Sequence, residues 1–298
     1  ILIFNIDFEQ YKVPVLIILN DIKSRFKLIN TEVLNNFTED IYKLTDEIIL
    51  THTHNKYTNI LKFTKNGLCC CFENYPSYIK EDKDGNYYYC EYQQIFGKTS
   101  KLHRVNGPAR IKIMDDVKRL LYYENGLKHR LNKPAVIEEN NISIIKYKKD
   151  FNQTFIYYKN GYIYRDEDKP AKIYVYGKQK IEYWYKNGER HRDNLPAIIE
   201  VHNNKIVEQV YYQNDEIHRL DGPAIIKPHY KLYVLFGKYM SPINYKIFLF
   251  KLKHIKLFEK SIFNERLTKK QLLEVAEYNN FKKATNYLLT LTVLDELI

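Results

Sequence analysis

The chain has 298 residues, of which 45% are hydrophobic and 28% are charged, and its formal net charge is +11 at pH 7. This balance is typical of a folded protein with its own core and excludes an intrinsically disordered chain. The 28 Tyr and 15 Phe favour β-strands over a helical bundle, because aromatic side chains suit a pleated sheet. The longest apolar run, residues 13–19, is much shorter than the roughly 20 residues of a membrane span, so no transmembrane segment is predicted.

Residues 1–56 are predicted to form an N-terminal segment of mixed, partly helical character. Helix-like patterns cover Asp21–Lys27 and Glu39–Leu50, and positive and negative side chains balance. The segment contains no motif that carries chemistry. A degenerate F-box-like adaptor is an alternative interpretation of it.

Residues 57–240 contain a recurring phrase, in which an Asn-Gly turn is followed by His-Arg and then by Pro-Ala. The clearest copy runs from Trp184 to Ile199. Recurrence of one phrase along a chain is the signature of a repeat architecture. Incomplete copies at Asn66-Gly67 and Phe236-Gly237 are expected to end the array. The His-Arg positions of the copies are His103-Arg104, His129-Arg130, Tyr164-Arg165, His191-Arg192 and His218-Arg219.

Each copy predicts two short strands joined by a tight turn. Asn-Gly tolerates the positive φ of such a turn, and Pro is suited to the first residue of a strand. Apolar residues then alternate with period two, which predicts one buried face. That face contains Ile111, Ile137, Ile173, Ile199 and Ile226. The opposite, exposed face is predicted to hold one aromatic residue per copy, namely Tyr122, Tyr157, Trp184 and Tyr211. The predicted fold is therefore mainly β, an extended antiparallel array of hairpins with helical flanks.

The phrase Trp-Tyr-x-Asn-Gly-x-x-His-Arg-x-x-x-Pro-Ala-x-Ile resembles the MORN-like repeat of proteins from large DNA viruses, phages and some bacteria. The resemblance implies a twisted, open β-meander that contacts proteins or membrane surfaces, with no shared catalytic activity. Tyr164 in place of His and Asp215 in place of Gly depart from the family pattern. The abundance of Lys, Asn, Ile and Tyr, whose codons are AT-rich, is in keeping with a giant-virus source.

Residues 241–298 are predicted to form a C-terminal helical cap over the last hairpin. Apolar residues from Phe248 to Ile262 follow helical spacing, and Thr268 with Gln271 forms a capping box that starts a second helix. The last part resembles a helix-turn-helix pair of ankyrin type.

The His-Arg pairs are the strongest candidate for a site. Equivalent residues of neighbouring copies would lie about 9–10 Å apart, twice the strand spacing, whereas ligands of one metal lie about 2 Å from it. We therefore expect the pairs to be structural, with His and Arg donating to turn carbonyls and packing on the neighbouring Tyr. A ligand-binding ladder is the alternative. No catalytic residue, metal ligand or cofactor is predicted, so the chain is not expected to be an enzyme.

Four cysteines, Cys69, Cys70, Cys71 and Cys90, have neither the spacing of a zinc site nor the number of a disulfide framework. They are predicted to be buried or partly exposed free thiols. This favours a reducing, intracellular location, in the cytoplasm of a host or infected cell, with the virion as an alternative.

The function predicted from these features is that of a non-enzymatic repeat scaffold or protein-interaction module, whose protein partner and oligomeric state the sequence does not identify. The alternative is a protein that binds nucleic acid or another anionic surface through a basic, aromatic face. Because the excess positive charge is spread along the chain, such binding is expected to be weak and sensitive to salt.

Overall fold

The computed structural model describes residues 6–34, 37–84, 86–115, 117–140, 152–246 and 248–249. The chain divides into two compact units, Ile1–Glu216 and Ile217–Ile298. The fold is mainly β and is built from antiparallel hairpins, as the sequence predicts.

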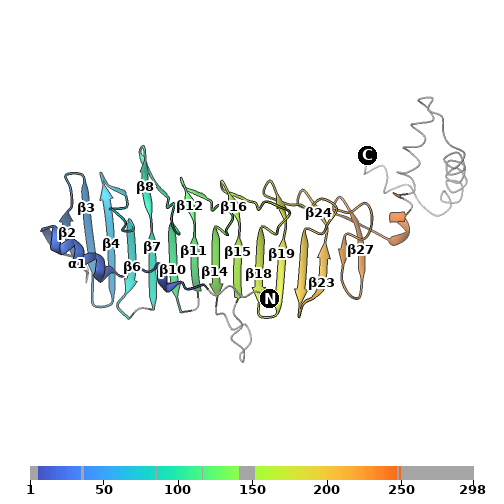
Figure 1. Ribbon diagram of the computed structural model, residues 1–298, viewed down its shortest axis with the longest axis horizontal. Helices are drawn as coiled ribbons and strands as arrows, with labels where there is room; N and C mark the ends of the chain where they lie inside the picture. Colours follow the sequence, from blue (N-terminus) through green and yellow to red (C-terminus); the bar gives the residue numbers. More distant parts are fainter. Residues whose placement is uncertain are drawn as a thin grey trace, which may run out of the picture. The chain divides into compact units, whose positions relative to one another are not determined.

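A single antiparallel meander forms the body of the first unit (Figure 1). Each long strand pairs with the long strands that precede and follow it in the chain. These strands are β1 (Leu28–Leu34), β2 (Phe37–Lys43), β3 (Ile48–His54), β4 (Thr58–Lys65), β6 (Tyr78–Asp82), β7 (Tyr87–Glu91), β10 (Arg110–Met114), β11 (Val117–Leu121), β14 (Val136–Asn140), β15 (Asn152–Ile156), β18 (Lys172–Tyr176), β19 (Gln179–Tyr183), β22 (Ile198–His202) and β23 (Lys205–Val210).

Small hairpins interrupt the meander at one end of the long strands. Their turns place Asn and Gly at positive φ, for example 54° at Asn187 and 87° at Gly188, which explains the recurring Asn-Gly pair. The hairpins are β8 (Gln93–Phe96) with β9 (Thr99–Leu102), β12 (Tyr123–Glu124) with β13 (Leu127–Lys128), β16 (Tyr158–Lys159) with β17 (Tyr162–Ile163), and β20 (Tyr185–Lys186) with β21 (Glu189–Arg190). The other short strands up to residue 217 are β5 (Leu68–Cys69), β24 (Tyr212–Gln213) and β25 (Glu216–Ile217).

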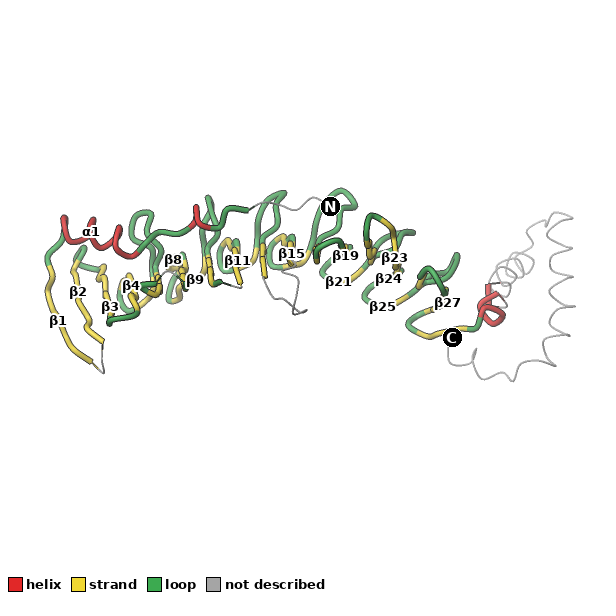
Figure 2. The backbone as a smooth tube through the Cα atoms, turned by 90° about the horizontal axis from the view of Figure 1, so that it is seen from below, coloured by secondary structure: helices red, strands yellow, loops and turns green. Residues whose placement is uncertain are grey.

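The N-terminal segment covers one face of the sheet. It contains a 3-10 turn, η1 (Glu9–Tyr11), and the helix α1 (Val15–Arg25), which lies over the first strands (Figure 2). The buried residues of α1 belong to one core with the sheet residues Leu50, Leu61 and Phe63. Farther along the sheet, the hydroxyl of Tyr88 on β7 accepts a hydrogen bond of 3.0 Å from the Val13 N–H.

The helix expected over Glu39–Leu50 is wrong. These residues lie in β2, β3 and the turn between them, and the sheet begins at Leu28, within the segment expected to precede it. The physical reason is the period-two pattern of burial, since Leu50 and His52 are buried on one face of β3 while Ile49, the residue before Leu50, is exposed on the other.

Within the first unit, the predicted row of isoleucines lies on one face, but its burial is uneven. Cross-strand register joins Ile111, Leu120, Ile137, Phe155 and Ile173 in one row. Ile111 and Ile137 are buried, whereas Ile173, Ile199 and Ile226 are only half-buried. The expectation of full burial is therefore wrong for the last three.

The second unit contains β26 (Ile225–Ile226), β27 (Lys231–Leu235) and β28 (Lys238–Met240), followed by a short helix over 242–246. Apart from this helix and residues 248–249, the predicted helical cap of 241–298 lies outside the described residues. Of the helices in the described ranges, none has the length and apolar character needed to cross a membrane.

Candidate functional site

The arginine of each His-Arg pair closes the corner between a long strand and its small hairpin. Its guanidinium donates to the carbonyl of the proline that opens the next long strand, at 3.1–3.3 Å in every copy. In the first unit it also lies over the ring of the corner aromatic residue, at 3.6–4.0 Å from the ring centroid. The pairs are Arg104 on Tyr92, Arg130 on Tyr122, Arg165 on Tyr157 and Arg192 on Trp184. The guanidinium therefore satisfies a carbonyl and packs on an aromatic ring within one copy.

The corner aromatics are not the exposed face that the sequence suggests. Tyr122 is 5% exposed and Trp184 is 7% exposed, while Tyr157 and Tyr211 are half-buried. The prediction fails because the chain bends at this residue instead of continuing as a straight strand. The backbone N–H of Trp184 donates to the Ala197 carbonyl at 2.8 Å, and the backbone carbonyl of Trp184 accepts from the backbone N–H of His191 at 3.2 Å.

The histidines of the pairs act between copies, and they accept hydrogen bonds. In three junctions of the first unit, the Nδ1 atom of His lies 3.0–3.3 Å from the N–H of the turn Asn in the next hairpin, and at His191 it also lies 3.0 Å from the Asn214 side-chain oxygen. These contacts join Asn125 to His103, Asn160 to His129 and Asn214 to His191. In the second unit, His218 Nδ1 accepts from the Phe236 N–H at 3.1 Å. The expectation that His would donate to turn carbonyls is therefore wrong.

The two departures from the repeat phrase change the junctions in different ways. Asp215, which replaces the turn Gly, accepts from Arg190 Nε at 2.6 Å and from the Arg190 N–H at 3.0 Å. The hydrogen bond from the Arg190 side chain is the main reason that the pKa of Asp215 lies below its usual value. Tyr164 has no ring nitrogen, and its hydroxyl donates to Asp166 at 2.8 Å instead.

Two surface pockets flank Tyr164. One, of about 310 Å³, is lined by residues that include His129, Tyr157 and Tyr164. The other, of about 510 Å³, is lined by Lys159, Asn160, Tyr162, Tyr164 and Asn187. Both pockets thus lie at the irregular copy.

Large apolar side chains are exposed along the small hairpins and the bends beside them. We call this set the hairpin edge. Two of its members reach the turn glycine of the next hairpin, since a Cβ placed on Gly161 would lie 3.4 Å from Leu127 Cδ2, and one on Gly188 would lie 3.6 Å from Tyr162 Cδ1. The hairpin edge consists of Val105 (70% exposed), Leu127 (51%), Leu131 (73%) and Tyr162 (67%).

Basic side chains on the uncovered face of the sheet are paired with carboxylates. Arg110 lies opposite Glu91 in register, with 2.7 Å between Nη2 and Oε1, and Arg119 lies opposite Glu138. Farther along this face, the Lys172 ammonium lies 4.7 Å from the ring centroid of Tyr174. The pairing leaves the charge of these two arginines less available to a phosphate backbone.

The cysteines are free thiols, as predicted. Cys70 and Cys90 are buried, and Cys69 and Cys71 are half-buried. Burial raises the pKa of Cys90 to about 12 and that of Cys71 to about 11. These two thiols are therefore protonated, and poor nucleophiles, at neutral pH.

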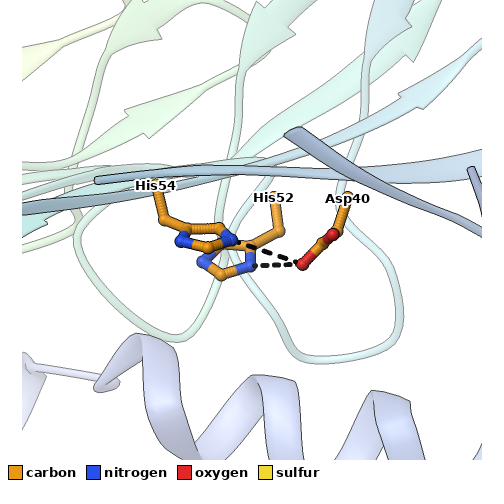
Figure 3. Close-up of side chains that lie close together, drawn as sticks. All are labelled: Asp40, His52 and His54. Carbon is orange, nitrogen blue, oxygen red and sulfur yellow. Dashed lines mark ion pairs between the residues drawn. The ribbon is translucent and has the colours of Figure 1, made fainter. Parts of the chain in front are cut away.

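Sequence reasoning missed the most concentrated group of ligand-type side chains in the described part of the chain. Asp40 on β2 and His52 and His54 on β3 lie together near α1 (Figure 3). Burial, followed by the neighbouring His54, lowers the pKa of His52 to about 4, so that its ring is neutral at neutral pH. The pattern His-x-His within a strand could have indicated that both imidazoles share a face.

A comparison with protein-family models gives no match, and neither does a comparison with curated proteins. The functional conclusion therefore rests on the residues and their geometry.

Proposed function

We propose that the protein is a non-enzymatic repeat scaffold of the MORN-like kind, which binds a protein partner through the hairpin edge. The observation that carries the proposal is the exposure of Leu127, Leu131 and Tyr162 on two consecutive copies. Leu127 reaches Gly161 of the next hairpin, and Tyr162 reaches Gly188 of the one after it. Exposed apolar side chains that form a continuous surface are typical of protein-interaction sites. A repeat array supplies such a surface because each copy presents equivalent positions in the same orientation.

The composition of the edge favours a partner with apolar and acidic groups. Lys128 and Lys159 are exposed or half-exposed beside the apolar residues, and their ammonium groups lie 4.9 and 5.2 Å from the rings of Tyr158 and Tyr164. Lys159 Nζ also lies 3.9 Å from Asp166 Oδ1, so Lys128 is the cation that a carboxylate on a partner would complement, while the apolar residues would form the centre of the contact. The free thiols support the further proposal of a reducing location, and the repeat phrase supports a viral source.

Site-specific crosslinking tests this proposal. A photoreactive amino acid at Tyr162 should crosslink one protein in an extract of the native cell, whereas the same group at Tyr57, which is 64% exposed on the β3–β4 turn, should not. The captured protein is then purified and its affinity measured. Tyr162→Ser together with Leu131→Ser should weaken binding by at least about tenfold, since central apolar contacts carry much of the binding energy. Equal loss of affinity in Tyr57→Ser would contradict the assignment of this edge.

Binding to nucleic acid is the alternative, and the Tyr174, Tyr176 and Tyr183 rings beside Lys172 are the feature that favours it. We expect a fluorescent single-stranded oligonucleotide to bind weakly and to dissociate by about 200 mM salt, because phosphate contacts release counterions. Tight binding at physiological salt, lost in Lys172→Ala, would overturn the scaffold proposal.

A further inference from the structure

Three ligand-type side chains converge on the face of the sheet that α1 covers (Figure 3). Asp40 and His52 lie directly opposite each other in the register of β2 and β3. His54 is two residues after His52, so both imidazoles project from the same face of β3. The sheet thus brings a carboxylate and two imidazoles together from adjacent strands.

The distances among these groups suit a single small ion. Asp40 Oδ2 lies 3.4 Å from His54 Nε2 and 3.7 Å from His52 Nδ1. All three ligand atoms lie within 4.8 Å of one another. Ligands of a tetrahedral zinc ion, with bonds of about 2.0–2.1 Å, lie about 3.3 Å apart. Small side-chain rotations would therefore bring the three atoms onto one coordination sphere.

His52 Nδ1 is a buried polar atom without a hydrogen-bond partner. The residue is only 5% exposed, and its other nitrogen, Nε2, lies 3.4 Å from the Asn59 side-chain carbonyl oxygen. In the tautomer that donates from Nε2 to Asn59, Nδ1 carries a lone pair, and this atom lies 3.7 Å from Asp40 Oδ2. Two acceptors that face each other repel, and a cation between them would satisfy both.

Outer contacts hold the carboxylate in the orientation that a ligand requires. The Thr31 hydroxyl on β1 donates to Asp40 Oδ1 at 2.9 Å, so that Oδ2 is left to face the two imidazoles. The side-chain oxygen of Asn59 on β4 lies next to His52 Nε2 and helps to hold the orientation of that imidazole ring. Metal sites commonly have such second contacts, which fix the ligand atoms before the ion binds.

We propose that Asp40, His52 and His54 form a binding site for a divalent transition-metal ion of the zinc class. Two imidazoles with one carboxylate suit such an ion, whereas Ca²⁺ and Mg²⁺ prefer oxygen ligands alone. The side chains of His54 and Asp40 are 29% and 16% exposed, which provides a route of entry. Three protein ligands leave a further position for water or for an atom of another molecule.

An ion at this site would join β2 to β3 beneath α1. Because it would bind the folded chain and find no preformed site in the unfolded chain, it would stabilise this end of the sheet by mass action. The proposal is independent of the hairpin edge, whose residues begin at Val105 on other elements.

Metal titration of the full chain, purified without a histidine tag and stripped with EDTA, tests the site. We expect ZnCl₂ in competition with a chromophoric chelator to give one tight site per chain. Asp40→Asn and His54→Ala should each lower the affinity by at least about tenfold, because even outer-shell changes commonly cost 10–100-fold. His202→Ala is the matched control, since it removes an exposed imidazole on β22, outside the cluster. Cobalt substitution should give the intense visible bands of a tetrahedral ion in the native chain and in the control.

A second measurement distinguishes the loss of a zinc ligand from a loss of folding. Zn²⁺ should raise the melting temperature of the native chain and of His202→Ala, but not that of Asp40→Asn, whose side chain keeps its size. Thr31→Val keeps all three ligands and should weaken binding less than Asp40→Asn does. Unchanged zinc affinity in Asp40→Asn, or an equal loss in His202→Ala, would overturn the proposal and leave the cluster as an Asp-His ion pair.

Discussion

In the first unit, the arginine at each corner makes two contacts that no other side chain combines as well. Its planar guanidinium covers an aromatic ring, and its N–H groups reach a proline carbonyl four or five residues on. At Arg192 the same group also forms two hydrogen bonds of 2.8 Å with Asp168. The corner therefore depends on arginine geometry as well as on positive charge.

We expect Arg192→Ala to lower the free energy of unfolding by roughly 1–3 kcal/mol, because it leaves the Pro196 carbonyl without its donor and uncovers Trp184. Urea denaturation followed by tryptophan fluorescence measures this locally, since Trp184 is the single tryptophan of the chain. Arg192→Lys should recover little of the loss, whereas Lys186→Ala, an exposed change nearby, should have almost no effect. Full recovery by lysine would show that charge alone matters.

The buried thiols make a separate prediction about pH. Because burial raises the pKa of Cys90 to about 12, its thiolate fraction is negligible at pH 8 and remains small at pH 9. Iodoacetamide should therefore leave Cys90 unmodified in the folded protein at both pH values and modify it in urea, as measured by peptide mass spectrometry. Rapid native labelling at pH 8 would contradict the burial of this strand.

At the scale of elements, the small hairpins are held together by a main-chain contact and an imidazole. The Gly161 N–H donates to the Lys128 carbonyl at 2.9 Å, and the Asn160 N–H donates to His129 Nδ1 at 3.2 Å. Tyr164 stands where His would be and has no ring nitrogen, so it cannot accept a hydrogen bond from the N–H of Asn187 in the next hairpin. The pocket beside Tyr164 and Asn187 lies at this junction.

We expect Tyr164→His to stabilise the array, because the position follows its turn Gly by three residues, as His129 does, and would supply the missing acceptor. One additional hydrogen bond of this kind contributes about 0.5–1.5 kcal/mol. The gain should appear as a higher urea midpoint for the transition reported by Trp184 in the adjoining hairpin. Tyr164→Phe is the control, since it removes the hydrogen bond to Asp166 without adding an acceptor. A lower midpoint for Tyr164→His than for Tyr164→Phe would contradict the acceptor role.

At the scale of the first unit, burial differs along the sheet, and the N-terminal segment covers the first part of it. Phe8 lies beside Lys118 of β11, with 5.8 Å between the ring centroid and the ammonium, and α1 lies over β1–β4. Sheet residues under this cover, such as Leu61 and Ile111, are fully buried. On β22, by contrast, Ile199 is half-buried.

The same substitution should therefore cost different amounts at two equivalent positions. Ile111→Ala removes a fully buried side chain and should lower the free energy of unfolding by about 2–5 kcal/mol. Ile199→Ala should cost roughly half as much, because part of its side chain already contacts solvent. Thermal and urea denaturation of the two variants test this, and equal losses would show that the far strands are covered as well.

The local rules of the sequence were sufficient for the repeat. Asn-Gly determined the turns through positive φ, and period-two alternation determined which isoleucines share a face. Both depend on residues close together in the chain. The free state of the cysteines also followed from their number and spacing.

Contacts between distant residues decided the rest. Tyr122 and Trp184 are buried because an arginine eight residues later covers each of them, and Ile199 is less buried than Ile111 although the two occupy equivalent positions. Asp40 and His54 are separated by a turn in the chain, and only the register of β2 with β3 brings their side chains within 3.4 Å. Alternation within one strand shows which of its residues share a face, but not which residues of another strand lie opposite them or which segment covers that face. Strand register and the covering of a face therefore depend on the folded chain as a whole.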